Sequence, residues 1–141
     1  MKEVVGCGLD IEELFRFKDK LPDKSGTSRF AQLVYTPSEI ENNLNIQPGI
    51  TFPLGFCCKE AVFKSFGVSW TNSKISWKDI ELLFHDEKDL LNYSIRLSGF
   101  AEELYNEMKC CSFESSIEYT DTYVMFQVIL LSDSNTRGKE V

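Results

Sequence analysis

Residues 52–67 read FPLGFCCKEAVFKSFG, an apolar and aromatic stretch with three charged residues through its middle. Proline is tolerated in the first turn of a helix and glycine commonly follows the last turn, so Pro53 and Gly67 predict a helix between them. Apolar residues surround nearly the whole of this helix, which is typical of a helix buried at the centre of a domain. We therefore expect it to organise the core.

Two carboxylates and one lysine are the candidates for chemistry. Glu60 and Lys64 are four residues apart and so project side by side from the predicted helix. A buried carboxylate must be paired or bound to a metal, so the spacing alone leaves two readings open, a structural salt bridge or part of a ligand site. Asp10 follows GCGL, where small residues allow a ligand to come close.

The rest of the chain predicts a mixture of helices and strands. Thr36, Pro37 and Glu39 form the start signal of a helix over 36–44. The other expected elements are a strand over 4–9 ending at Asp10, helices over 11–20 and 25–35, a loop over 45–49, strands over 78–84 and 91–97, a helix from Ser98 to about Lys109, and a hairpin of strands over 111–119 and 122–131. The last strand is continuously apolar and is expected to be central. This pattern indicates one α+β domain over 1–131, followed by a polar, frayed tail over 132–141.

Composition excludes several classes of protein. The net charge of −7 argues against general nucleic-acid binding. No apolar run approaches the ~20 residues of a membrane helix, and the first ten residues do not resemble a signal peptide, so we expect a cytoplasmic protein without a membrane segment. The five cysteines show no CxxC spacing, which predicts buried reduced thiols rather than a zinc site.

Familiar catalytic patterns are also missing. The chain has a single histidine, His85, which lies in a charged turn. With only one histidine, most Ser-His-Asp and Cys-His arrangements are excluded. Neither GxGxxG nor GxxxxGK[ST] occurs, so dinucleotide-binding and P-loop sites are not indicated.

The chain resembles the holo-acyl-carrier-protein synthases, a class of 4′-phosphopantetheinyl transferase, over nearly its whole length. The family pattern G-[IVL]-G-x-D-I-x-[ED]-[IL]-x-R is similar to residues 6–16, and RFAxKEAxxKAxG is similar to residues 55–67. Arg29-Phe30 and residues 35–39 resemble the helix start RFxxRxLTxxE, and 76–83 and 123–130 resemble two of the family's strands. The resemblance implies the transferase fold, an antiparallel sheet packed on a long central helix.

The resemblance also implies a reaction. The family moves the 4′-phosphopantetheine arm of coenzyme A to a serine of a carrier protein and releases adenosine 3′,5′-bisphosphate. It implies Mg²⁺ held by Asp10 and Glu60, with Asp10, Glu60 and Lys64 as the catalytic residues. Coenzyme A would contact Lys59, Lys64, Ser65 and Gly67. Two acceptors for the serine proton remain possible, Glu60 or a metal-bound water.

The resemblance implies partners too, an acyl carrier protein and two further copies of the chain in a homotrimer. Residues 16–29 hold five basic residues against two acidic ones, a local balance of +3 on an acidic chain. This segment could be a solvated helix face or a surface for an acidic partner. The family resemblance favours the second reading, with Arg16, Lys20 and Arg29 docking the acidic helix of the carrier protein.

Three departures from the family pattern matter, and the changes at Gly55 and Tyr119 weaken the expected contacts to the coenzyme A 3′-phosphate. Gly55 stands where the family has an arginine, and Glu114 and Tyr119 stand where it has histidines. The turn between the two middle strands is the acidic segment 85–89. A catalytically weak or silent homologue that serves as a binding or scaffold subunit is therefore the alternative to an active transferase.

Overall fold

The computed structural model describes residues 1–23, 26–68, 71 and 73–133. Its elements, in chain order, are β1 (Lys2–Glu13), η1 (Leu14–Phe17), α1 (Arg29–Val34), α2 (Pro37–Leu44), α3 (Pro48–Ser65), η2 (Trp77–Asp79), β2 (Ile80–Phe84), β3 (Tyr93–Leu97), α4 (Gly99–Glu107), β4 (Cys110–Tyr119) and β5 (Tyr123–Asp133). The α+β class predicted from the sequence is confirmed. No helix in the described ranges is long and apolar enough to cross a membrane.

The central helix α3 is buried on nearly all sides, as its apolar composition predicts. It begins at Pro48, not near residue 52, so part of the loop expected over 45–49 is helical. Pro48 and Pro53 each suit the first turn of a helix. The helix starts at Pro48, so Pro53 lies inside it. Gly67 follows the last turn with φ of +72°, a conformation that favours glycine, as predicted.

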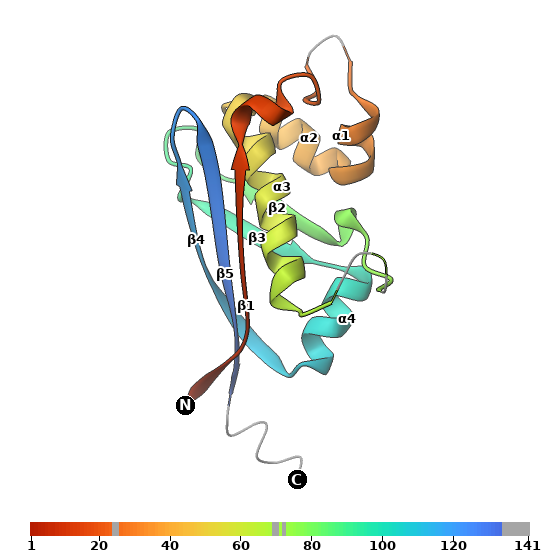
Figure 1. Ribbon diagram of the computed structural model, residues 1–141, viewed down its shortest axis with the longest axis vertical. Helices are drawn as coiled ribbons and strands as arrows, with labels where there is room; N and C mark the ends of the chain where they lie inside the picture. The colour runs from red at the N-terminus through yellow and green to blue at the C-terminus, as the bar shows by residue number, and fades with distance from the viewer. Residues whose placement is uncertain (24–25, 69–70, 72, 134–141) are drawn as a thin grey trace.

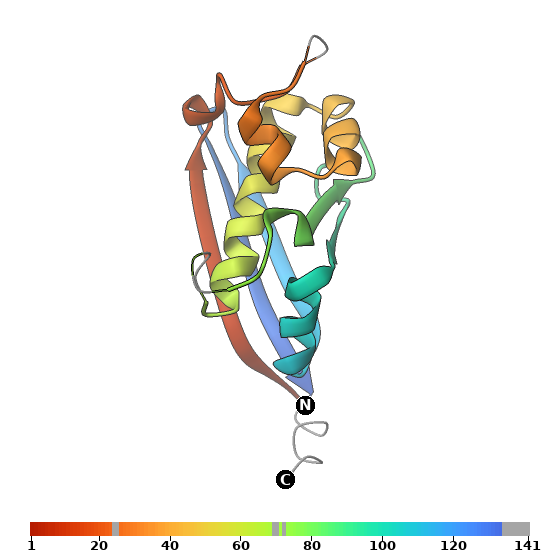
Figure 2. The ribbon, with the colours of Figure 1, turned by 90° about the vertical axis from the view of Figure 1, so that its right-hand side faces the viewer.

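Two antiparallel sheets support this helix. The larger has the order β1-β5-β4, so the apolar last strand is central, as predicted, and β2 and β3 form the smaller sheet. Figures 1 and 2 show α3 running along one face of the larger sheet, with β2, β3 and α4 on the other side of the helix. One continuous core joins α3 to alternate residues of β5, namely Val124, Phe126, Val128 and Leu130.

Strand β1 continues three residues beyond its predicted end, and the helix expected over 11–20 does not form. The strand pairs with β5 as far as Glu13 opposite Tyr123, and only the short η1 follows. Backbone pairing with a strand more than a hundred residues away therefore outweighs the local helical spacing. As a result, Asp10 and Glu12 lie on the same face of one strand, because side chains alternate along it.

The helix start signal at residue 36 is confirmed, and the helix expected over 25–35 forms as the shorter α1. The Ser28 hydroxyl accepts a hydrogen bond from the Ala31 N–H at the start of α1. Thr36 and Glu39 form the predicted capping box of α2. At the other end of the chain, Ser132 is buried and lies within β5, so the domain extends past the predicted boundary at 131. The predicted tail lies, from residue 134 onward, outside the described residues.

Candidate functional site

Two glycines of β1 let the central helix lie against the strand. A Cβ at Gly8 would stand 1.8 Å from the backbone oxygen of Ala61, and a Cβ at Gly6 would stand 2.1 Å from that of Ser65. Any side chain there would push the helix away. Asp10 is the next residue on the same face of β1, so the close approach brings its carboxylate beside α3.

Asp10 and Lys64 meet across this contact. Lys64 Nζ donates hydrogen bonds to Asp10 Oδ1 at 2.9 Å and to the backbone oxygen of Leu9 at 3.1 Å. The hydrogen bond that Lys64 donates to Asp10 is the largest cause that raises the pKa of Lys64, and the charges of Asp10, Glu60 and Glu12 raise it further. The lysine therefore stays charged, with its side chain 49% exposed and open to a ligand.

Glu60 belongs to the same cluster. It lies one turn before Lys64 on α3, and its charge acts on both Lys64 and Glu12. The sequence-predicted trio of Asp10, Glu60 and Lys64 is thus brought together by β1 and α3, and Glu60 with Lys64 is more than an isolated pair on the helix.

Glu12 is a member that the sequence reading missed. Burial, a hydrogen bond with Asp10, and the charges of Asp10 and Glu60 raise the pKa of the Glu12 carboxyl to about 7, while Arg16 opposes this. The signal lay in the two-residue spacing from Asp10, which matters only if the strand continues past residue 10.

The cluster suits a magnesium ion. Asp10 Oδ2 is buried, and no donor in the described part of the chain reaches it at hydrogen-bonding geometry. The Glu12 carboxyl beside it repels it when both are charged, so an oxygen of Asp10 is left for a cationic ligand. Among the described residues, no three His, Cys, Asp or Glu side chains stand close enough together to enclose a metal. Mg²⁺ commonly takes only one or two carboxylates and completes its shell with phosphates and water, so this donor set fits it.

Lys59 does not face this cluster, so we correct its predicted contact with coenzyme A. Its side chain is fully buried, and its Nζ lies 2.7 Å from Glu39 Oε1. It also donates to the backbone oxygens of Trp77 and Ile80. Glu39 in turn accepts the Leu82 N–H. Lys59 therefore ties α3 to α2 and β2 inside the protein.

Ser65 also points inward, because its hydroxyl donates to the Val62 backbone oxygen and the residue is 4% exposed. A hydroxyl contact from Ser65 to coenzyme A is therefore not supported. Gly67 has open space where a Cβ would stand, which leaves its backbone accessible. Its contact with coenzyme A stays a prediction.

Gly55 occupies the position at which the family pattern has an arginine. A Cβ at Gly55 would stand 3.3 Å from the Tyr35 ring and 3.8 Å from Glu39 Oε2, so this position faces α2. A long side chain would have to displace Tyr35. Tyr119, at the end of β4, is 44% exposed.

The predicted partner-binding residues lie near one another in the chain's basic segment. Arg16 sits in η1 with its side chain 68% exposed, and Arg29 begins α1 and is exposed. Lys20 Nζ lies 5.4 Å from the centre of the Phe30 ring. Figure 1 places η1 and α1 at the end of the molecule opposite both termini. Lys24, from the same segment, lies outside the described residues.

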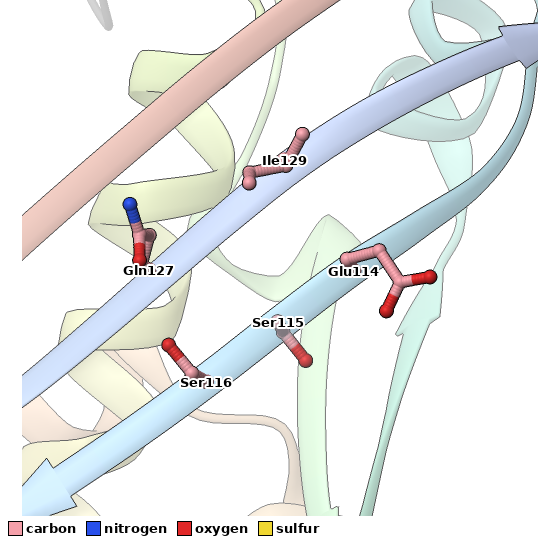
Figure 3. A pocket seen from close by; sticks show the side chains of 5 residues that line it. All are labelled: Glu114, Ser115, Ser116, Gln127 and Ile129. Carbon is pink, nitrogen blue, oxygen red and sulfur yellow. The ribbon is translucent and has the colours of Figure 1, made fainter. Parts of the chain in front are cut away.

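The face of the larger sheet that points away from α3 carries no helix in the described ranges (Figures 1 and 2). A hollow of about 160 Å³ lies on β4 and β5. Figure 3 shows the side chains that line it, Glu114, Ser115, Ser116, Gln127 and Ile129. On the neighbouring β1, Leu9 and Ile11 are 44% and 56% exposed. Apolar side chains and a hollow thus share one open surface.

Comparison with known proteins gives one consistent result. The family model described as the 4′-phosphopantetheinyl transferase superfamily matches residues 6–127. A holo-[acyl-carrier-protein] synthase of Ruminiclostridium cellulolyticum is 33% identical over 131 residues, covering 90% of this chain and 92% of that protein. A synthase of the same name from Natranaerobius thermophilus is 30% identical, covering 92% of this chain and 99% of that protein.

Solved structures share the fold. The holo-[acyl-carrier-protein] synthase of Neisseria meningitidis aligns with a TM-score of 0.74 at 21% identity, covering 91% of this chain and 98% of that one. The Helicobacter pylori synthase, solved in complex with coenzyme A, aligns with a TM-score of 0.68 at 22% identity, covering 88% and 98%.

Proposed function

The chain belongs to the 4′-phosphopantetheinyl transferase superfamily, and from that premise we propose that it is an active holo-[acyl-carrier-protein] synthase. It transfers the 4′-phosphopantetheine arm of coenzyme A to a serine of an acyl carrier protein, depends on Mg²⁺ and releases adenosine 3′,5′-bisphosphate. Coenzyme A as co-substrate agrees with the Helicobacter pylori structure. The observation that carries the proposal is the meeting of Asp10, Glu60 and Lys64 across β1 and α3.

The residues of this trio divide two tasks. Asp10 and Glu60 would hold the cation, and an oxygen of the buried Asp10 carboxylate is left for it. When bound, Mg²⁺ neutralises the pyrophosphate charge and polarises the phosphoryl group that is attacked. Lys64 contacts the phosphates from the exposed side and stabilises the charge that develops on the leaving group. Because Asp10 holds the lysine in place, little reorganisation is needed when the substrate binds.

The carrier protein docks on the basic segment. Arg16, Lys20 and Arg29 present positive charge on a chain with a net charge of −7, and Phe15 beside them is 75% exposed. A cationic rim around an apolar side chain suits an acidic amphipathic helix. Such complementary charge raises the encounter rate and selects the partner more than it adds affinity.

Three copies of the chain form the working enzyme, and they meet through the open face of the larger sheet. Leu9 and Ile11 on β1 supply apolar surface there. The enzyme works in the cytoplasm, which agrees with the free thiols of all five cysteines.

The test is direct transfer. The protein is incubated with coenzyme A, Mg²⁺ and several apo carrier proteins, and the mass gain of each carrier is followed. We expect the gain of one arm, its loss in EDTA and its recovery with added Mg²⁺. Glu60→Gln should abolish transfer while leaving the thermal transition in place. If no carrier gains mass and calorimetry detects no coenzyme A binding, the proposal is wrong and the scaffold alternative gains support.

A further inference from the structure

Asn43 of α2 carries a buried side-chain amide that finds no partner in the described part of the chain. The residue is 0% exposed, and neither its Nδ2 nor its Oδ1 makes a hydrogen bond there. The preceding residue, Asn42, uses both of its amide atoms, because it donates to the Phe84 backbone oxygen and accepts the Phe84 N–H. A buried amide left unpaired is costly. Asn43 therefore calls for a hydrogen-bonding group that the described chain does not supply.

The missing side chain of Gly55 leaves a gap beside this amide. Gly55 lies within α3, and the point where its Cβ would stand is 3.9 Å from Asn43 Nδ2 and 3.8 Å from Glu39 Oε2. Asn43 and Glu39 are four residues apart on α2, so their side chains project side by side. The amide nevertheless makes no direct hydrogen bond to the carboxylate. A donor and an acceptor thus border one gap between two helices.

The surroundings restrict what this gap can hold. The charge of Glu39 is already balanced by Lys59, whose Nζ lies 2.7 Å from Oε1, so a second cation is not needed. Glu39 Oε2 accepts the Leu82 N–H at 3.1 Å, and a carboxylate oxygen can accept one more hydrogen bond. The Tyr35 ring, 3.3 Å from the Cβ position of Gly55, limits the size. The gap therefore suits a small neutral molecule that both donates and accepts hydrogen bonds.

We propose that the gap at Gly55 is an internal binding site for one water molecule, which accepts a hydrogen bond from Asn43 Nδ2 and donates one to Glu39 Oε2. Ordered waters commonly satisfy buried polar groups in this way. If the amide is turned over, the same water donates to Oδ1 instead. The water fills the contact of α2 with α3 at the position where the family pattern has an arginine. This inference concerns the interior of the chain and does not depend on the proposed reaction.

Oxygen-17 relaxation dispersion tests the proposal, because it counts water molecules that are held inside a protein. We expect about one held water fewer in Gly55→Ser, whose hydroxyl occupies the gap, and in Asn43→Leu, which keeps the branching of the side chain without its polar atoms. Asn43→Leu leaves position 55 unchanged, so it keeps the test open if Gly55→Ser does not fold.

Gly49→Ser is the matched control for the water count. Gly49 also lies in α3, and nothing stands within 4 Å of its Cβ position, so a hydroxyl there displaces no internal water. Its count should equal that of the wild type. An unchanged count in Asn43→Leu and in folded Gly55→Ser overturns the proposal, and so does an equal loss in Gly49→Ser.

The melting temperatures of Gly55→Ala and Gly55→Ser give a second test. Both variants place the same Cβ beside the Tyr35 ring, so their difference reports the hydroxyl. Alanine displaces the water and leaves Asn43 unpaired, whereas serine replaces the lost hydrogen bond. Gly55→Ser should therefore melt about 3 °C or more above Gly55→Ala, although alanine has the higher helix propensity. This advantage should vanish when Asn43→Leu is added to both, and Gly55→Ala melting as high as Gly55→Ser overturns the proposal.

Discussion

Lys64 Nζ of the central helix lies 2.9 Å from Asp10 Oδ1 of the first strand, although the two residues are 54 positions apart in the chain. The contact exists because Gly6 and Gly8 remove the side chains that would hold the strand and the helix apart. It fixes the lysine beside the carboxylate that we expect to hold the cation. The packing of β1 on α3 thus positions the two residues in the site.

Lys64→Met should lower kcat of arm transfer far more than it raises KM for coenzyme A. The charge of Lys64 is needed most where negative charge builds up during transfer, and a lost charged contact of this kind costs roughly 2–4 kcal/mol in the transition state. Steady-state kinetics with an apo carrier protein measure the two constants. A KM increase at constant kcat would show that Lys64 only binds the co-substrate.

Lys59→Met should destabilise the protein by about 3–5 kcal/mol, because it leaves the Glu39 carboxylate buried without its cation. Burial already raises the pKa of Glu39 against the effect of Lys59. The double variant Lys59→Met with Glu39→Gln removes the unpaired charge and should recover much of the loss. Urea unfolding of the three proteins measures this. Equal stability of the single and double variants would mean that the buried charge is not the cause.

These two lysines show where sequence reasoning succeeds and where it stops. The helix α2 could be predicted because its capping box, Thr36 with Glu39, is a local signal. The direction of Lys59 could not, because α3 is apolar on all sides and its sequence marks no solvent-facing stripe. The functional role proposed for Lys64 came from family resemblance, since its spacing to Glu60 fits an ordinary ion pair equally well.

The end of β1 escaped prediction for a different reason. Ile11, Leu14 and Phe15 repeat with a helical spacing, yet residues 11–13 pair with β5, whose sequence lies far away. Such long-range pairing leaves no local signal. Glu12 was missed for the same reason, since its position beside Asp10 follows only from the strand.

Gly8→Ala tests whether the close approach of β1 and α3 builds the site. The new Cβ would stand 1.8 Å from the Ala61 backbone oxygen, so the strand and helix must separate. We expect a loss of stability beyond the roughly 1–3 kcal/mol of ordinary overpacking, together with a loss of transfer activity even at temperatures where the variant is folded. Gly49→Ala is the control, because nothing lies within 4 Å of its Cβ position. Full activity of folded Gly8→Ala would show that this close contact is not needed for activity.

Arg29→Glu should raise KM for the carrier protein by roughly tenfold and leave KM for coenzyme A unchanged, because we propose that the arginine belongs to the docking surface. The effect should shrink at high ionic strength, where salt screens exposed charges. Lys2→Glu makes the same charge change on β1, at the opposite end of the strand from η1, and should have little effect. Equal losses in both variants would point to net charge instead of a docking surface.

The pH dependence of stability should reveal the crowded carboxylates in the protein freed of metal by EDTA. The pKa of Glu12 is raised to about 7 in the folded protein, above the ordinary value of 4.5. The folded state therefore holds the Glu12 proton more tightly than the unfolded state does. Its contribution to stability is fully present below about pH 4.5 and is lost as the pH rises through about 7.

The melting temperature of the metal-free wild type should therefore fall between about pH 5.5 and about pH 8, and Glu12→Gln should fall less over the same range. Lys64, whose pKa is raised, stays charged throughout and does not contribute to the difference between the two proteins. Scanning calorimetry in EDTA measures both curves. Parallel curves would mean that Glu12 keeps its ordinary pKa, and hence that Asp10 and Glu60 do not crowd it in solution.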